Sequence, residues 1–126
     1  MSLDIGFLFF KNNSKRWTSF SVRIINSFDL LICTSKYESL PLSIIESLSM
    51  STPVISTDVG DIAYDLRQYK CGYVVKPSAI NFINKIYMIK KNNILKLNLS
   101  KNARKNILKN FNIKNYSYRL EKEFSY

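Results

Sequence analysis

Two glutamates, Glu38 and Glu46, are separated by seven residues and flank the point where a strand pattern gives way to a helix pattern. Ionised carboxylates accept hydrogen bonds and cannot donate them. The first turn of the following helix would add free backbone N–H groups, which suit an anion such as a diphosphate. The spacing therefore predicts a ligand site bounded by two carboxylates and a helix N-terminus.

The elements on either side of this stretch explain how the two carboxylates would be held. The apolar run from Leu30 to Thr34 is typical of a parallel strand buried on both faces. Pro41 suits the first position of a helix, where its missing N–H costs nothing. In open α/β sheets, ligands bind beyond the carboxyl ends of the strands, so we expect both glutamates to line one such crevice.

Further strands and helices are predicted on both sides of this unit. We expect strands at 5–10, at 53–57, which begins with a proline, and at 72–75. We expect a helix from Ser14 or Thr18 to Phe28, containing Trp17 and Phe20, and a short one from an Asp61 N-cap to about Tyr69. Strands that alternate with helices indicate βαβ units and a parallel sheet.

The last third of the chain is predicted to be helical. A helix with an N-cap at Ser78 is followed by a break at Asn92-Asn93, a second helix and a third one near Tyr116, Leu120 and Phe124. The residues expected to face the core are Leu42, Ile45, Leu48 and Ser49 in the helix after Pro41, Ile80, Ile83, Ile86, Tyr87 and Ile89 in the next, and Ile94, Leu97, Leu99, Ala103, Ile107 and Leu108 in the one after.

Composition narrows the class of protein. The chain has 126 residues, of which 46% are apolar, enough for one domain with a core. No apolar run approaches the roughly 18 residues of a membrane span, and no basic region precedes the N-terminal apolar run as in a secretory signal. Cys33 and Cys71 lack metal-ligand spacing and are expected to be buried free thiols of a reducing compartment. The absence of histidine excludes His-dependent catalysis within this chain.

The net charge of +10 is concentrated near the C-terminus. Residues 1–78 hold eight Lys or Arg and seven Asp or Glu, whereas residues 79–126 hold eleven and two. We divide the single domain into an α/β segment (1–78) and a basic helical tail (79–126). The tail has three interpretations: a solvated helix face, a surface for anionic lipid, and a nucleic-acid surface, for which no accompanying motif is present.

The segment from 26 to 77 resembles the second half of the nucleotide-sugar-binding domain of retaining GT-B glycosyltransferases, the family-four group. The resemblance is carried by the strand Asp29-Leu30-Leu31-Ile32-Cys33 leading to Ser35 and Glu38, then by Pro41 to Leu48 with Glu46, by Pro53-Val54-Ile55-Ser56-Thr57-Asp58-Val59-Gly60 and by Gly72-Tyr73-Val74-Val75-Lys76-Pro77. It implies a partial Rossmann-like α/β domain with a short parallel sheet, flanking helices and a helical C-terminal tail.

The resemblance also implies a role for each matched residue. Glu38 would be the catalytic-site residue that accepts hydrogen bonds from the donor sugar, and Glu46 would accept from the ribose hydroxyls. The backbone around Ser39 to Leu42 would face the sugar and the diphosphate. The donor-binding residues are therefore Ser35, Glu38, Ser39, Leu40, Pro41, Leu42 and Glu46. No metal or other cofactor is implied, because the nucleotide diphosphate sugar is itself the donor substrate.

The implied activity is hexose transfer, with retention, to a polysaccharide or glycolipid acceptor. No segment of this chain matches the family's acceptor domain or its basic pair that clamps the diphosphate, so we expect a fragment that is inactive alone. The alternatives are a non-catalytic donor-binding module and a basic helical membrane adaptor. We expect a cytoplasmic protein, peripheral at the inner face of the membrane, which self-associates through an incomplete sheet edge.

Overall fold

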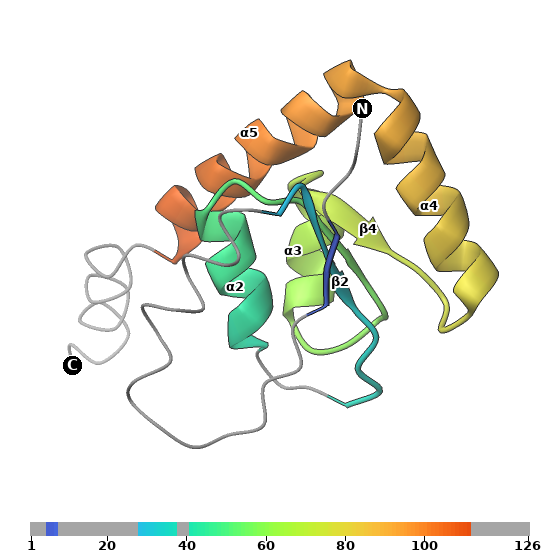
Figure 1. Cartoon of the computed structure of the whole chain (residues 1–126). Coiled ribbons are helices and arrows are strands. Elements are labelled where there is room, and N and C mark those ends of the chain that lie inside the picture. Colours follow the sequence, from blue (N-terminus) through green and yellow to red (C-terminus); the bar gives the residue numbers. More distant parts are fainter. Residues whose placement is uncertain (1–4, 8–27, 38–40, 112–126) are drawn as a thin grey trace, which may run out of the picture.

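The computed structural model describes residues 5–7, 28–37 and 41–111 (Figure 1). Strands and helices alternate along the described chain. They are β1 (Ile5–Phe7), β2 (Leu30–Cys33), α2 (Leu42–Ser49), β3 (Val54–Ser56), α3 (Ile62–Gln68), β4 (Gly72–Val74), α4 (Ala79–Lys91) and α5 (Asn93–Asn110).

The four strands form one parallel sheet in the order β1-β2-β3-β4. Each strand pairs with the next one along the chain, for example Ile32 with Ile55 and Ile55 with Tyr73. Because parallel neighbours need a crossover, α2 and α3 are the connections between β2, β3 and β4. The predicted α/β fold with a short parallel sheet and flanking helices is thus confirmed.

Alternating strand residues belong to two hydrophobic clusters, one on each face of the sheet. Leu31 and Val54 pack with α2, α3 and the last turns of α5. Leu30, Ile32 and Ile55 pack instead with α4 and the first turns of α5. Since successive side chains of a strand point to opposite faces, both faces are covered, which explains why β2 is apolar throughout.

Gly72 allows β4 to approach its neighbour closely. A Cβ atom built at this position would lie 2.1 Å from the carbonyl oxygen of Val54. The obstacle is backbone rather than a flexible side chain, so no other residue type fits without displacement of a strand. Gly72 therefore fixes the pairing of β3 with β4.

Helix α5 crosses the sheet at the edge where the strands begin. Lys96 forms an ion pair with Asp29, which stands just before β2, and the Asn102 side chain donates to the carbonyl of Lys70, just before β4. Arg104 donates to the carbonyl of Ser49, the last residue of α2, at 2.5 Å. These partners share one edge because the strands are parallel, and Figure 1 shows α5 running along that edge. The amino edge of the sheet is therefore covered by α5.

The buried faces of the helices differ in part from the predicted ones. In α2 the buried residues are Ile44, Ser47 and Leu48, and Leu42 is exposed. Helix α2 has apolar residues on two sides, so its sequence pattern is compatible with either side facing the core. Packing against the sheet and α5 determines which side is buried.

The same difference occurs in α4 and α5. In α4, Phe82 and Ile89 are buried, whereas the predicted Ile80, Ile83 and Tyr87 are exposed. In α5, Leu99, Ala103 and Ile107 are buried as predicted, together with Asn106, and three predicted core residues are exposed: Ile94, Leu97 and Leu108. Each helix here has more apolar residues than the sheet can cover.

The helix ends follow the predicted positions with different hydrogen bonds. Asp61 and Ser78 occupy the N-cap positions of α3 and α4, but neither side chain makes a capping bond. The Asn92 side chain accepts from the N–H of Leu95 at 2.9 Å, so the predicted break at Asn92 is the N-cap of α5. Pro41 precedes α2 as its N-cap rather than its first residue.

Two predicted helices lie outside the described residues, namely the one from Ser14 or Thr18 with Trp17 and Phe20 and the final one near Tyr116. The same holds for the predicted strand beyond Phe7. Both cysteines are free thiols, and Cys71 is buried while Cys33 is half-buried. Over the ranges that the structure describes, no helix combines the length and the apolar character needed to cross a bilayer.

Candidate functional site

The carboxyl edge of the sheet, opposite α5, gathers the ends of the strands and the starts of the helices. Here β2 leads to Ser35, β3 leads to Thr57 and Asp58, and the first turns of α2 and α3 begin. Figure 1 shows these turns on the side of the sheet away from α5. This is the position at which open α/β sheets bind ligands.

Hydrogen bonds between the ends of β2 and β3 hold Ser35 in place. The N–H of Thr57 donates to the carbonyl of Cys33 at 3.2 Å, and the Thr57 hydroxyl donates to the carbonyl of Ser35 at 2.5 Å. The Cys33 thiol lies 3.6 Å from the Ser35 hydroxyl. Sequence reasoning had missed Thr57 as the residue that positions Ser35, although a hydroxyl directly after a strand is a usable signal for such a bond.

Glu46 lies on the flank of α2 that does not face the core. It stands two residues after buried Ile44 and two before buried Leu48, which in a helix is close to the opposite side. The side chain is half-buried, and this desolvation raises the pKa of the Glu46 carboxyl. A carboxylate that has lost part of its hydration would gain from hydrogen-bond donors of a ligand.

The start of α2 presents backbone donors on the same edge. The N–H groups of Ile44 and Ile45 donate to the carbonyl of Pro41, which begins the helical bonding. The N–H groups of the two preceding residues, Leu42 and Ser43, precede this pattern and suit an acceptor outside the helix. The Leu42 side chain is exposed, and Pro41 is buried.

The structure thus places four of the predicted site residues around one connection. Ser35 follows the end of β2, Pro41 is the N-cap of α2, Leu42 is the first residue of that helix, and Glu46 lies one turn later. Three further predicted residues of this connection, Glu38, Ser39 and Leu40, lie outside the described residues. The convergence of Glu38 and Glu46 on one ligand stays a prediction.

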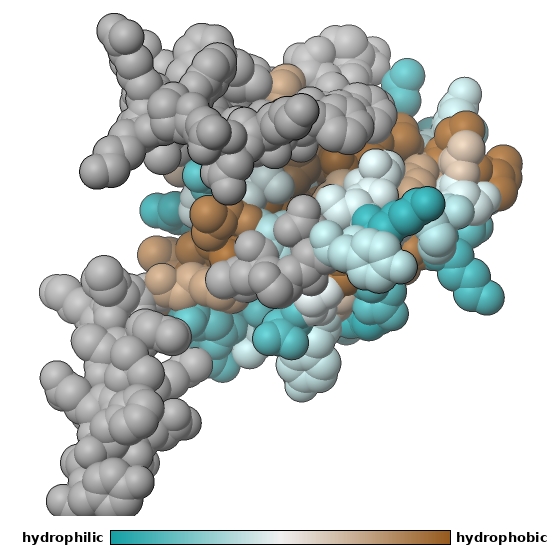
Figure 2. Space-filling model, turned by 90° about the horizontal axis from the view of Figure 1, so that it is seen from below, coloured by the Kyte–Doolittle hydropathy of each residue, from teal (hydrophilic) through white to brown (hydrophobic). Residues whose placement is uncertain are grey.

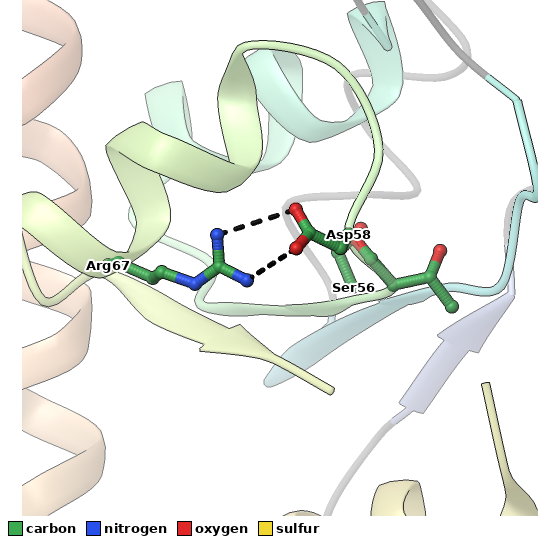
Figure 3. A network of polar contacts seen from close by, with 4 residues as sticks. Ser56, Asp58 and Arg67 are labelled. Atoms are coloured by element: carbon green, nitrogen blue, oxygen red, sulfur yellow. Dashed lines mark hydrogen bonds and ion pairs between the residues drawn. The ribbon is translucent and has the colours of Figure 1, made fainter. Parts of the chain in front are cut away.

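Asp58 and Arg67 form an exposed ion pair beside this connection (Figure 3). Two guanidinium nitrogens lie 2.8 and 3.4 Å from the two carboxylate oxygens. The hydrogen bond from Arg67 lowers the pKa of Asp58, and Asp58 in turn raises the pKa of Arg67. The pair ties the turn after β3 to α3, so Asp58 has a structural role.

The surface of this edge is of mixed character. Figure 2 views the molecule from below, onto the carboxyl edge, and shows hydrophilic and hydrophobic residues interspersed across the coloured surface. In the described ranges, no three His, Cys, Asp or Glu side chains lie close enough to hold a metal ion. Backbone amides, hydroxyls and the half-buried Glu46 carboxylate are therefore among the groups that the described residues of this edge offer to a ligand.

Comparison with known proteins places this arrangement in a family. The model of the family described as glycosyl transferases group 1 matches residues 6–106, which include α4 and most of α5. A curated relative, the poly(ribitol-phosphate) alpha-N-acetylglucosaminyltransferase of Staphylococcus aureus (strain COL), is 29% identical over 99 residues. The match covers 77% of this chain and 20% of the relative, so the chain spans about a fifth of that protein.

Solved structures show the same fold. The sucrose-phosphate synthase of Thermosynechococcus elongatus superposes with a TM-score of 0.71 at 24% identity, over 80% of this chain and 26% of that one. The C-terminal domain of a glycosyl transferase group 1 family protein from Francisella tularensis gives a TM-score of 0.67 at 22% identity, over 85% of this chain and 53% of that domain.

A structure of TarM from S. aureus in complex with fondaparinux, alpha-GlcNAc-glycerol and UDP gives a TM-score of 0.69 at 25% identity. That match covers 86% of this chain and 22% of TarM. The family model spans most of the chain, and the structural neighbours superpose on 80–86% of it. The chain belongs to the glycosyl transferases group 1 family, whose fold is GT-B.

Proposed function

We propose that the carboxyl edge of the sheet binds the nucleotide diphosphate sugar of a retaining hexosyl transfer. Glu38 would accept hydrogen bonds from the sugar, and Glu46 would accept them from the ribose hydroxyls. Backbone amides from Ser39 to Leu42 would bind the diphosphate and stabilise its charge as it departs, the largest single contribution in many such reactions. The acceptor would be a polysaccharide or a glycolipid.

The half-buried Glu46 is the observation that carries this proposal. Burial raises its pKa, and no cation of the described residues offsets that effect. Ribose offers two neighbouring hydroxyl donors, and hydrogen bonds to a charged group contribute about 1.5–3 kcal/mol each. A ligand that supplies such donors would therefore be favoured at this position.

The relatives support a nucleotide-sugar ligand. One is named as an alpha-N-acetylglucosaminyltransferase, and the TarM structure holds UDP together with alpha-GlcNAc-glycerol. Since the chain covers 20% and 22% of these two proteins, we propose that it works as one part of a larger enzyme. We expect the 126-residue chain alone to bind the donor without detectable sugar transfer.

Calorimetric titration of the chain with UDP, and separately with GDP, tests the proposal. Glu46→Gln keeps the shape of the side chain and removes its charge, so affinity should fall about 10- to 100-fold. Asp61→Asn is the matched control, because Asp61 is an exposed carboxylate at the start of α3 that has no assigned role. This control should bind like the unmodified chain.

Equal affinities of the Glu46→Gln and unmodified chains would overturn the assignment of Glu46. No heat of binding with either nucleotide, from a chain shown to be folded by circular dichroism, would remove the donor site altogether. Sugar transfer by the chain alone would contradict the expectation that a further domain is needed.

A further inference from the structure

The outward face of α5 combines exposed leucines with exposed cations. Its inward face holds Leu99, Ala103 and Ile107, which are buried against the sheet and its helices. The outward residues recur at positions 97, 101, 104, 105 and 108, the spacing of one helical face. They line a shallow groove of about 670 Å³ together with Ser51, Ser100 and Lys109.

The charged residues that line this groove in the described part of the chain are all cations. From residue 66 to residue 111 the chain holds eleven Lys or Arg and no Asp or Glu. Three cations of α5 have contacts within the protein: Lys96 with Asp29, Arg104 with the Ser49 carbonyl, and Lys109 over the Tyr69 ring. Lys101 and Lys105 are exposed, and neither forms an ion pair with another described residue.

Large apolar side chains lie among these cations. Leu97 is 59% exposed and Leu108 is 51% exposed, and Ile94 at the start of the same helix is 73% exposed. A nucleic acid would pair with the lysines but would leave these leucines facing hydrated phosphates. A bilayer with anionic headgroups suits both the lysines and the leucines. The lysine ammonium groups stay at the headgroups, while the apolar side chains enter the boundary with the acyl chains.

We propose that the face of α5 formed by Leu97, Lys101, Lys105 and Leu108 docks on an anionic lipid bilayer. The orientation that results is compatible with the donor site. Since α5 covers the amino edge of the sheet, a membrane against it leaves the carboxyl edge turned toward the solution, where a soluble nucleotide sugar is available. The proposal does not depend on the donor assignment, because it uses none of the donor residues.

Vesicle flotation of the 126-residue chain tests this docking. Vesicles of phosphatidylcholine alone are compared with vesicles that contain about 30% phosphatidylglycerol. We expect the chain to float with the anionic vesicles and to remain at the bottom with the neutral ones. Raising the salt from about 0.1 M to about 0.5 M should release most of it, because screening shortens the reach of the lysine charges.

Two pairs of substitutions separate the charge of α5 from the charge of the whole chain. Lys101→Gln with Lys105→Gln should weaken binding about fivefold for each lysine. Lys36→Gln with Lys76→Gln is the matched control, since both are exposed lysines at the carboxyl edge and the net charge changes equally. The control pair should float like the unmodified chain, and equal weakening by both pairs would overturn the docking face.

The leucines decide between a bilayer and any other polyanion. Leu97→Asn with Leu108→Asn leaves every charge in place and changes only exposed side chains, so the fold should be kept and lipid binding should fall. Binding to heparin and to duplex DNA is measured with the same variants. Lipid binding unaffected by the leucine pair, or strong DNA binding without flotation of the unmodified chain, would overturn the proposal in favour of a polyanion surface.

Discussion

The two edges of the sheet are built in opposite ways. The amino edge is covered by α5, which is joined to the starts of β2 and β4 and to the end of α2 by Lys96, Asn102 and Arg104. The carboxyl edge has no such covering helix among the described residues and instead presents hydroxyls, helix starts and the half-buried Glu46.

The difference follows from the parallel arrangement of the strands. Each crossover helix starts at the carboxyl edge and ends at the amino edge, so free N–H groups gather at one edge and free carbonyls at the other. The cations of α5 meet the carbonyl side, as Arg104 does at Ser49. An anionic ligand is suited to the N–H side. The amino edge of the sheet therefore contributes to stability through its contacts with α5, and the carboxyl edge is suited to binding a ligand.

The largest effect on stability is expected from a substitution that disrupts the sheet, because both edges belong to it. Gly72→Ala places a methyl group 2.1 Å from the Val54 carbonyl oxygen, so β3 and β4 must separate. We expect a loss of about 3 kcal/mol or more in the free energy of unfolding, measured by urea denaturation. Both UDP binding and lipid binding should be lost together. A variant that keeps full stability would contradict the close strand approach.

A smaller effect confined to the amino edge is expected from Asn106→Ala. Asn106 is 1% exposed, its amide group donates to the Cys71 sulfur at 3.7 Å, and its oxygen accepts from Asn110 at 2.6 Å. Removal should cost about 1–3 kcal/mol, because buried partners lose a hydrogen bond. UDP affinity of the folded fraction should not change. Asn98→Ala, at an exposed position of the same helix, is the control.

The strands were the part of the fold that sequence predicted best. Continuous apolar runs such as Leu30 to Cys33 are typical of parallel strands in a sheet that is covered on both faces. The helix faces were predicted less well. Ile80 and Ile83 share a regular helical spacing with Ile86, yet the structure exposes the first two and buries Phe82. Periodicity shows that a helix has an apolar side, and tertiary packing decides how much of it is covered.

For the candidate site, too, the sequence predicted some features and not others. The strand that precedes Ser35 and the helix that carries Glu46 follow from local sequence patterns, so the places of both residues could be predicted. The Thr57 bond to the Ser35 carbonyl joins residues 22 positions apart, and the Asp58–Arg67 pair depends on where α3 packs. Such contacts arise from the assembled fold, and no single stretch of sequence contains them.

Glu46→Gln should change stability in the direction opposite to its effect on binding. The folded pKa of Glu46 is raised above 4.5, so the folded state binds this proton more tightly than the unfolded state. Stability therefore falls as pH rises from 4.5 through the raised pKa. The variant should gain less than about 1 kcal/mol at pH 7, since the side chain keeps much of its water, and nothing below the unfolded pKa. Equal melting temperatures at pH 7 would contradict the desolvation of this carboxylate.

The smallest effect on stability is expected from Asp58→Asn, although two guanidinium nitrogens of Arg67 face the two carboxylate oxygens of Asp58. Both partners are exposed, with 68% of the Asp58 side chain and 55% of the Arg67 side chain in contact with solvent, so water and salt screen the attraction. The folded pKa of Asp58 lies below 3.8, so its contribution is present above that pH and is lost as pH falls through the lowered pKa. Melting temperatures of the two chains should differ slightly at pH 7 in low salt and coincide in high salt. A large difference that survives high salt would mean that the pair holds the turn after β3 at the carboxyl edge, which would make this edge as firmly built as the amino one.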